Sequence, residues 1–126
     1  MYVDGFVIPV PADGRDAFIA HARRVDAKLI AFGATRIVET LGHDVPHGQA
    51  TDFYRAVAAG EGETVAFAWI EWPDKATRDA AFARLRADPM MDEGKPPFDG
   101  RRMIFGGFET VVEMDRGSSH SGGGGA

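Results

Sequence analysis

The chain has 126 residues, a net charge of −5 at pH 7 and no cysteine. This length corresponds to one domain, and the lack of cysteine excludes disulfides, thiolate nucleophiles and cysteine-ligated metal sites. The acidic balance, without any basic patch, argues against nucleic acid and membrane as partners. Because the sequence has no cysteine, no signal peptide and no apolar run long enough to span a membrane, we expect a cytoplasmic protein.

The N-terminal part of the chain predicts a strand and a helix. Residues 2–9 are apolar on both alternating faces, which is typical of a central strand, and the prolines there are expected to end it. A helix is expected from Asp13, as its N-cap, to about Phe32, with Gly33 as the residue that ends it. One apolar stripe at helical spacing supports this helix: Phe18, Ala22, Val25, Leu29 and Phe32.

The middle of the chain predicts further strands and a second helix. Alternating apolar residues indicate strands over residues 34–41 and 64–72, and a short additional strand over 53–58. The second helix is expected over residues 75–87. Asp74 precedes it and has the side chain of a good N-cap.

The C-terminal part predicts a loop, a last strand and a tail. The loop is expected over residues 90–100 and the strand over 102–114. Residues 1–115 therefore form the predicted domain. Residues 116–126 are rich in glycine and serine, which is typical of a flexible tail or an appended linker.

The order of these elements predicts an α+β fold. Strand–helix–strand twice over indicates a ferredoxin-like split βαβ antiparallel sheet with two helices on one face. The other face then needs a second copy of the chain as its cover, so we expect a homodimer. The residues expected on that face are Phe6, Ile8, Ile37, Phe67, Trp69 and Phe105. A pocket is expected between the helices and the sheet, on the face formed by the alternate strand residues with smaller side chains: Val3, Gly5, Ala66, Ala68, Ile70, Gly106 and Phe108.

Three segments of the chain are similar to a known family. They read YVDGFVIPVP (2–11), FAWIEWP (67–73) and PFDGRRMIFGGFE (97–109). In residues and in order they closely resemble the YbaA-like family, a bacterial family of unknown function. The resemblance implies a dimeric α+β barrel, in which two ferredoxin-like sheets pack face to face. The wider superfamily includes cofactor-independent monooxygenases, isomerase-like degradative enzymes and haem enzymes. The family has no established catalytic residues to carry over.

Two acids and a histidine are the candidate catalytic groups. Asp4 and Glu39 lie in predicted strands, and a buried carboxyl must be paired or carry a proton. A protonated carboxyl in an apolar cavity suits proton transfer near neutral pH. The simpler interpretation is that Asp4 pairs with a backbone N–H or with an arginine such as Arg102. His21 lies beside the apolar stripe of the first helix, and it is either catalytic or a partly buried structural residue.

Trp69, Phe98 and Arg102 are the candidate substrate-binding residues. Aromatic side chains suit a planar substrate, but the same side chains would also fill a core or a dimer interface. Arg102 could close the end of the last strand. Because a bulge at Gly106–Gly107 would reverse the alternation of side chains, the pocket opens either under the helices or on the opposite face.

No metal ion and no other cofactor is expected. His43, Asp44 and His47 are metal-ligand types, but Pro46 prevents the helical spacing that would hold both histidines on one face. A solvated loop is the simpler interpretation. Signatures of hydrolases, kinases and dinucleotide-binding enzymes are absent from the sequence.

Two functions are compatible with this sequence. The first is a cofactor-independent enzyme that acts on a small hydrophobic or aromatic metabolite by proton transfer or oxygenation. The second is a non-catalytic homodimer that binds a small hydrophobic molecule or takes part in a stress response. No motif names a reaction, so the choice depends on how the candidate residues are arranged in the pocket.

Overall fold

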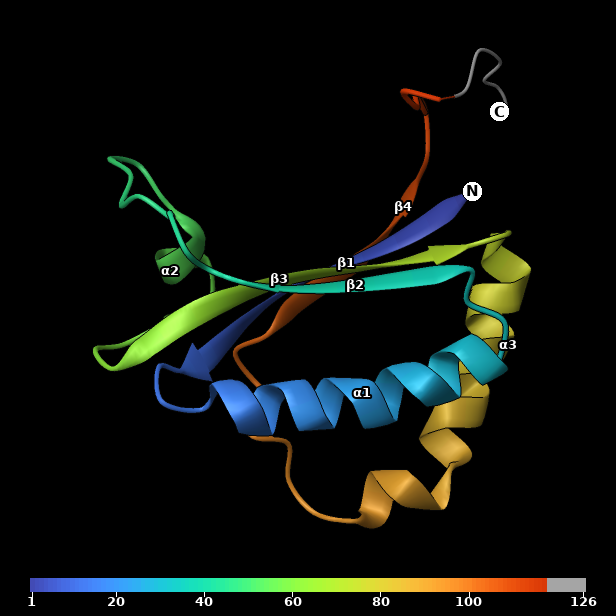
Figure 1. The fold of residues 1–126 in the computed structure, drawn as a ribbon, viewed down its shortest axis with the longest axis horizontal. Coiled ribbons are helices and arrows are strands. Elements are labelled where there is room, and N and C mark those ends of the chain that lie inside the picture. Colours follow the sequence, from blue (N-terminus) through green and yellow to red (C-terminus); the bar gives the residue numbers. More distant parts are fainter. Residues whose placement is uncertain (118–126) are drawn as a thin grey trace.

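Four strands form one antiparallel sheet in the computed structural model, which describes residues 1–117 (Figure 1). The elements are β1 (Tyr2–Pro11), α1 (Arg15–Ala31), β2 (Arg36–Leu41), α2 (Phe53–Ala56), β3 (Glu63–Trp72), α3 (Lys75–Ala87), a 3₁₀ turn (Pro89–Asp92) and β4 (Ile104–Glu109). The strands lie in the order β2-β3-β1-β4. This order confirms the predicted ferredoxin-like α+β fold. Of the predicted tail, residues 118–126 lie outside the described residues.

Helices α1 and α3 lie against one face of the sheet, below it in Figure 1, and the short α2 lies near one end of the other face. The predicted apolar stripe of α1 is confirmed, because Phe18, Ala22 and Leu29 are buried. On α3, the fully buried Ala81 permits close approach to the core, where Trp72 is also fully buried.

The end of α1 follows the prediction. Gly33 has a φ of 125°, a left-handed conformation that glycine adopts without strain. Its N–H donates to the carbonyl of Ile30 at 3.1 Å, and the N–H of Ala34 donates to the carbonyl of Leu29 at 3.0 Å. This pair of hydrogen bonds is a Schellman motif, which satisfies the last carbonyls of the helix.

Two predictions were wrong at places where a helix begins: the N-cap of α1, and a strand where α2 lies. Gly14 stands at the N-cap of α1, with no side-chain hydrogen bond, where Asp13 was expected. Residues 53–58 do not form a strand, because α2 begins there. The carboxylate of Asp52 accepts a hydrogen bond from the backbone N–H of Arg55 at 2.8 Å and so caps that helix.

Strand pairing explains why β1 is longer and β4 shorter than predicted. β4 pairs only with residues 2–7 of β1, so residues 8–11 have a neighbouring strand on one side and tolerate two prolines. At the other end the pairing stops at Tyr2 opposite Glu109. The strand ends at Glu109 and not at residue 114, and after it the N–H of Thr110 donates to the carbonyl of Met1 at 3.3 Å.

The predicted faces were right for β3 and wrong for β1, β2 and β4. Residues directly opposite in an antiparallel pair share a face. Phe6 lies opposite Ala68 and Phe105, so it lies on the helix side, whereas Gly5 lies opposite Trp69 and Gly106 on the open side. The helix side therefore carries Phe6, Ile8, Ile37, Ala66, Ala68, Ile70 and Phe105. The open face carries Val3, Gly5, Val7, Val38, Phe67, Trp69, Ile104, Gly106 and Phe108.

Candidate functional site

An apolar pocket of about 210 Å³ lies between the two long helices and the helix side of the sheet. Apolar side chains from β1, β3, α1, α3 and the loop before β4 form its walls: Phe6, Ile8, Phe18, Val25, Leu29, Ala68, Ile70, Phe82, Leu85, Phe98 and Met103. We call this space the interior pocket. Its titratable lining residues are His21 and Asp26 from α1 and Glu39 from β2. A few polar groups in an otherwise apolar cavity are typical of a small-molecule site.

Asp26 and Glu39 form a carboxyl–carboxyl pair in this pocket. Burial, together with the hydrogen bond and the negative charge of Asp26, raises the pKa of Glu39 to about 8. Burial also raises the pKa of Asp26 above its usual range, although the hydrogen bond from Glu39 lowers it. Glu39 therefore keeps its proton at neutral pH and donates its O–H to the Asp26 carboxylate.

His21 lies at the mouth of the pocket, against Phe98. The two rings meet edge to face, with their centroids 5.5 Å apart. Burial lowers the pKa of His21, the positive charge of Arg24 lowers it further, and the charge of Asp26 opposes this shift. The imidazole is therefore neutral near pH 7 and able to accept a proton.

Two grooves adjoin the interior pocket and share lining residues with it. The first, here called the β2-edge groove, is lined by Arg15, Phe18, Ile19, Ala22, Arg23, Asp26, Glu39, Thr40 and Leu41. The second, here called the loop groove, lies between α1 and the loop after α3, and it includes His21, Arg24, Met90, Lys95, Phe98 and Met103. The carboxyl pair thus borders the pocket and the first groove, and His21 borders the pocket and the second.

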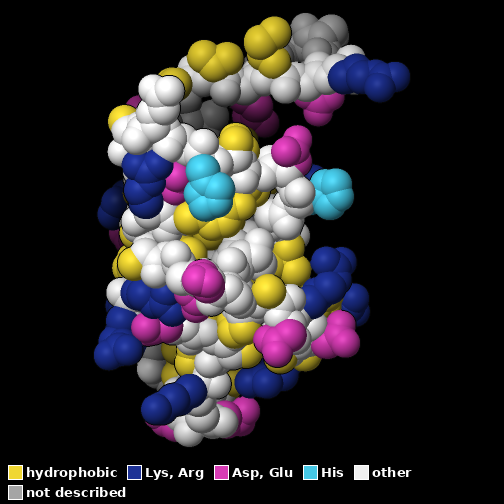
Figure 2. Space-filling model, turned by 90° about the vertical axis from the view of Figure 1, so that its left-hand side faces the viewer, with side chains coloured by type: hydrophobic (Ala, Val, Ile, Leu, Met, Phe, Trp, Pro, Cys, Tyr) yellow, Lys and Arg dark blue, Asp and Glu magenta, His cyan; other side chains and the backbone are white. Residues whose placement is uncertain are grey.

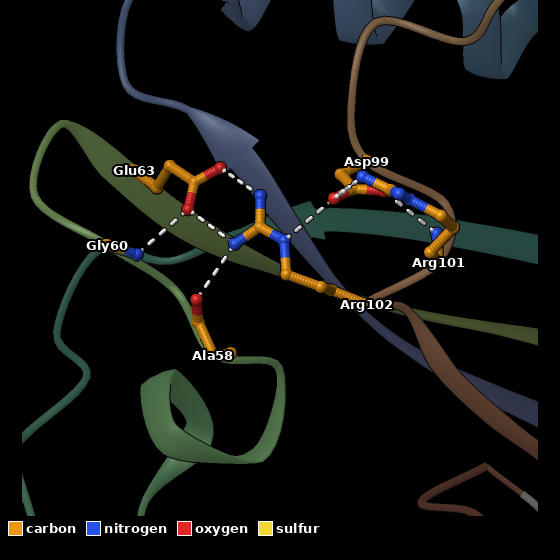
Figure 3. A network of polar contacts seen from close by, with 6 residues as sticks. All are labelled: Ala58, Gly60, Glu63, Asp99, Arg101 and Arg102. Atoms are coloured by element: carbon orange, nitrogen blue, oxygen red, sulfur yellow. Dashed lines mark hydrogen bonds and ion pairs between the residues drawn. The ribbon is translucent and has the colours of Figure 1, made fainter.

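The loop that carries Phe98 is held by Arg102 (Figure 3). The Arg102 guanidinium donates to both carboxylate oxygens of Glu63, at 2.8 and 2.7 Å, and to the carbonyl of Ala58 at 2.8 Å. Its Nε donates to Asp99 at 3.1 Å. Because Arg102 stabilises the carboxylate, the pKa of Glu63 falls to about 2. This network ties the loop to the start of β3.

Asp4 is paired outside the interior pocket. Its side chain is buried and accepts hydrogen bonds from Arg78 Nη2 at 2.8 Å and from Trp72 Nε1 at 2.8 Å. The Arg78 guanidinium lies 5.3 Å from the ring centroid of Tyr2 and 5.2 Å from that of Phe82. An ion pair was the simpler interpretation of Asp4, but the partner is Arg78 and not Arg102, which binds Glu63.

The structure brings together half of the six residues predicted for the site. Glu39, His21 and Phe98 all line the interior pocket. Trp69 lies on the open face, where its Nε1 donates to Glu71 at 2.9 Å, and Arg102 lies in the loop network. The direct substrate contacts predicted for Trp69 and Arg102, and the catalytic role predicted for Asp4, stay predictions.

Asp26 was missed by the sequence reasoning, although a signal was present. Ala22, Asp26 and Leu29 follow the i, i+4, i+7 spacing of one helix face, so an acid belongs to the predicted apolar stripe. Gly5, expected in the pocket, lies on the other side of the sheet. A Cβ added there would meet the ring of Phe108 at 3.7 Å and would leave the interior pocket unfilled.

Within residues 1–117 no group of three or more acidic, histidine or cysteine side chains is placed to hold a metal ion. His47 stacks on Tyr54 with the ring centroids 4.5 Å apart, near Asp52. No helix in the same range has the length and apolar character needed to cross a membrane.

Comparisons with known proteins place the chain among close relatives. It is 51% identical over 114 residues to "Uncharacterized protein YbaA" of Escherichia coli strain K12, an alignment that covers 89% of this chain and 97% of that protein. The YbaA protein of Shigella flexneri matches to the same extent. Among solved structures, a dimeric ferredoxin-like protein from an uncultured marine organism aligns with a TM-score of 0.48 and 10% identity, covering 92% of this chain and 100% of that one.

The family model described as "Protein of unknown function (DUF1428)" matches residues 1–100. That match covers most of the domain, including α1, β2 and the loop that borders the pocket. Together with the 51% identity to YbaA, it confirms the predicted resemblance, and the chain belongs to the DUF1428 family.

Proposed function

We propose that the protein binds a small, planar, apolar carbonyl compound in the interior pocket and catalyses proton transfer between its carbon and oxygen atoms. One observation carries the proposal: a carboxyl pair, Asp26 and Glu39, faces an apolar cavity that also exposes His21. Pairs of groups with pKa values shifted toward neutrality are typical of acid–base sites.

Glu39 is the acid and His21 the base in this proposal. Glu39, with a pKa of about 8, holds a proton at pH 7, and when the ligand is bound its O–H turns from Asp26 and donates this proton to the carbonyl oxygen of the ligand. The neutral His21 removes a proton from the carbon next to that carbonyl. The C–H electron pair becomes a C=C bond while the carbonyl oxygen gains the proton from Glu39, so an enol forms, and no redox partner is needed.

The size and polarity of the pocket support a compound of this class. A cavity of about 150 Å³ lined by apolar side chains is known to hold benzene, and the interior pocket has about 210 Å³. One aromatic ring with a small carbonyl substituent fits this space. The walls present no cationic side chain, so the pocket itself favours an uncharged ligand.

The test uses 2-indanone, a planar ketone with acidic C–H bonds beside the carbonyl. Its exchange of hydrogen for deuterium in D₂O near pH 7 is followed by NMR. We expect the native protein to accelerate the exchange, and Glu39→Gln and His21→Gln each to reduce the acceleration by about 100-fold. Arg86→Gln, an exposed residue of α3 that does not line the interior pocket, is the control and should leave it unchanged.

The same measurement separates catalysis from simple binding. If 2-indanone saturates the native protein, seen as shifts of NMR signals from pocket residues, but exchanges no faster than in buffer, the proton-transfer proposal fails. The non-catalytic function, storage or sensing of a small apolar molecule, is then the correct one.

We also propose that the protein works as a homodimer through the open face of its sheet. Phe67, Ile104 and Phe108 on this face are 45%, 45% and 60% exposed. The segment after β4 adds Val111, Val112 and Met114, and Figure 2 shows hydrophobic side chains standing out on the segment beside the grey residues. So large an apolar surface is typical of an interface, and a second copy offers a matching one.

We place this homodimer in the cytoplasm. The support is the absence of cysteine from all 126 residues, which fits a reducing compartment. Cell fractionation with an antibody against the protein tests the location, and recovery in an extracytoplasmic fraction would contradict it.

A further inference from the structure

The carboxyl pair lies at the boundary between the interior pocket and the surface. Asp26 and Glu39 line the interior pocket and also the β2-edge groove, as do Phe18 and Ala22. The remaining lining of the groove includes Arg15 and Arg23 from α1 and Thr40 from β2, all of which are exposed. One hydrogen-bonded pair of carboxyls therefore borders both an apolar ligand space and a solvent-facing one.

We propose that Asp26 and Glu39 form a proton relay that carries protons from the β2-edge groove to the interior pocket, so that Glu39 is recharged from solvent while the pocket is occupied. Both side chains line both spaces, and in this proposal Asp26 is the positioning and relaying residue while Glu39 donates to the ligand. This inference rests on the proposed function, because it assigns a source for the proton that Glu39 donates.

The relay step conserves protons. After Glu39 gives its proton to the ligand oxygen, both members of the pair are carboxylates, and their repulsion favours uptake of one proton. A water molecule or buffer acid in the groove protonates the outer oxygen of Asp26 and leaves as hydroxide or as the conjugate base. The protonated Asp26 carboxyl then turns its O–H toward Glu39, transfers that proton to the Glu39 carboxylate and becomes a carboxylate again. One proton has moved from solvent to the pocket.

The charges around the pair are compatible with this direction. On the groove side Arg15 and Arg23 are the cationic side chains in the lining, and Thr40 from β2 is neutral. On the pocket side the titratable neighbour is His21, whose charge interacts with Asp26. The hydrogen bond from Glu39 favours the ionised form of Asp26 between transfers, while burial keeps the proton on Glu39.

His21 provides the matching exit for the other proton. After it takes a proton from the ligand carbon, the imidazolium borders the loop groove and releases the proton there. Protons thus enter at the edge of β2 and leave beside the loop after α3. Glu39 regains its proton through the β2-edge groove, and His21 loses its proton through the loop groove. The enol product therefore does not have to return a proton to the protein.

The experiment measures proton exchange at Glu39 without any substrate. Carbon-13 relaxation dispersion of the Glu39 carboxyl, recorded near pH 8, gives the rate at which the proton leaves and returns. Ile19→Trp fills the β2-edge groove, Ala20→Trp is the control on the loop-groove side of the same helix, and Ala68→Val fills the interior pocket. Asp26→Asn keeps the shape but cannot carry a proton.

We expect Ile19→Trp and Asp26→Asn each to slow the exchange by at least about tenfold. Ala20→Trp and Ala68→Val should leave the rate within twofold of the native value. If Ile19→Trp fails to fold, Ile19→Phe is measured in its place, with the same expectation.

Two results would overturn the relay. Native-like exchange in the groove-filled variant means that protons do not enter by the groove, and slowed exchange in Ala68→Val means that they enter through the pocket. Because no ligand takes part, these outcomes are independent of the 2-indanone test. The two experiments together therefore distinguish a working relay in a protein that does not catalyse exchange of 2-indanone from catalysis that proceeds without the relay.

Discussion

At the scale of single residues, the Glu39 carboxyl couples stability to pH. Its pKa is about 8 in the folded protein and near 4.5 in the unfolded chain. Between these values the folded state binds more protons than the unfolded state, so stability falls as pH rises. Below pH 4.5 Glu39 is protonated in both states and does not lower the stability. Above pH 8 it is ionised in both states, and the loss of stability is complete.

Glu39→Gln should remove this dependence, because glutamine donates a hydrogen bond to Asp26 without ever ionising. Allowing for solvent screening of a half-buried group, we expect the variant to gain on the order of 1–2 kcal/mol over the native protein between pH 5 and pH 9. Urea unfolding at several pH values measures the free energy of unfolding of both proteins. A difference between them that stays constant with pH would contradict the raised pKa of Glu39.

The ion pair of Asp4 and Arg78 is the other residue-scale feature with a measurable consequence. The side chain of Asp4 is 1% exposed and that of Arg78 19% exposed. Arg78→Met leaves a buried carboxylate without its cation, which typically costs about 3–5 kcal/mol of unfolding free energy. Arg86→Met, on the exposed side of the same helix, is the control and should change stability by less than about 0.5 kcal/mol.

A double variant tests the cause of that loss. Asp4→Leu combined with Arg78→Met removes both charges and should recover part of the stability lost in Arg78→Met alone. If the double variant is less stable than the single one, the loss comes from packing of the Arg78 side chain on Tyr2 and Phe82 and not from the unpaired charge.

At the scale of elements, the loop between α3 and β4 depends on one arginine. Arg102 joins Asp99 to Glu63 (Figure 3), and Phe98, the residue before Asp99, lines the interior pocket. Arg102→Met breaks this network, so amide hydrogen exchange over residues 95–104 should become at least about tenfold faster. Arg102→Lys should behave similarly, since an ammonium lacks the planar fork that binds the carboxylate through two nitrogens.

The neighbouring residue offers a control for this prediction. Arg101 also pairs with Asp99, but its side chain is 91% exposed. Exposed ion pairs contribute little, so Arg101→Met should leave the exchange of the loop nearly unchanged. Equal effects of the two substitutions would mean that Asp99 alone orders the loop.

At the scale of the whole molecule, α1 and α3 cover one face of the sheet, and the proposed homodimer would cover most of the other. Phe108→Glu puts a charge into the proposed interface, so in analytical ultracentrifugation we expect the native protein to sediment as a dimer and the variant as a monomer. Phe105→Glu lies on the same strand but on the helix side, and it should remain dimeric. A native protein that sediments as a stable monomer at micromolar concentration would end the homodimer proposal.

Local patterns in the sequence determined most of the elements. A helix is built from contacts three and four residues apart, so the stripe of α1, the cap at Asp74 and the turn at Gly33 could be predicted from neighbours along the chain. The order of strands and helices then led to the ferredoxin-like sheet. The strand predicted over residues 53–58 was wrong because a competing local signal was stronger, since the cap at Asp52 starts a helix there. The N-cap of α1 was wrong by one residue, because Gly14 takes the place expected for Asp13.

Only the tertiary structure decided which strand faces meet and which polar groups share a space. Alternation within one strand says nothing about its phase relative to the next, which depends on register, and so Gly5 and Phe6 were assigned to the wrong sides. Asp26 and Glu39 belong to different elements and became a pair only when α1 packed on β2. Their shifted pKa values come from burial and mutual contact, which exist only in the folded chain.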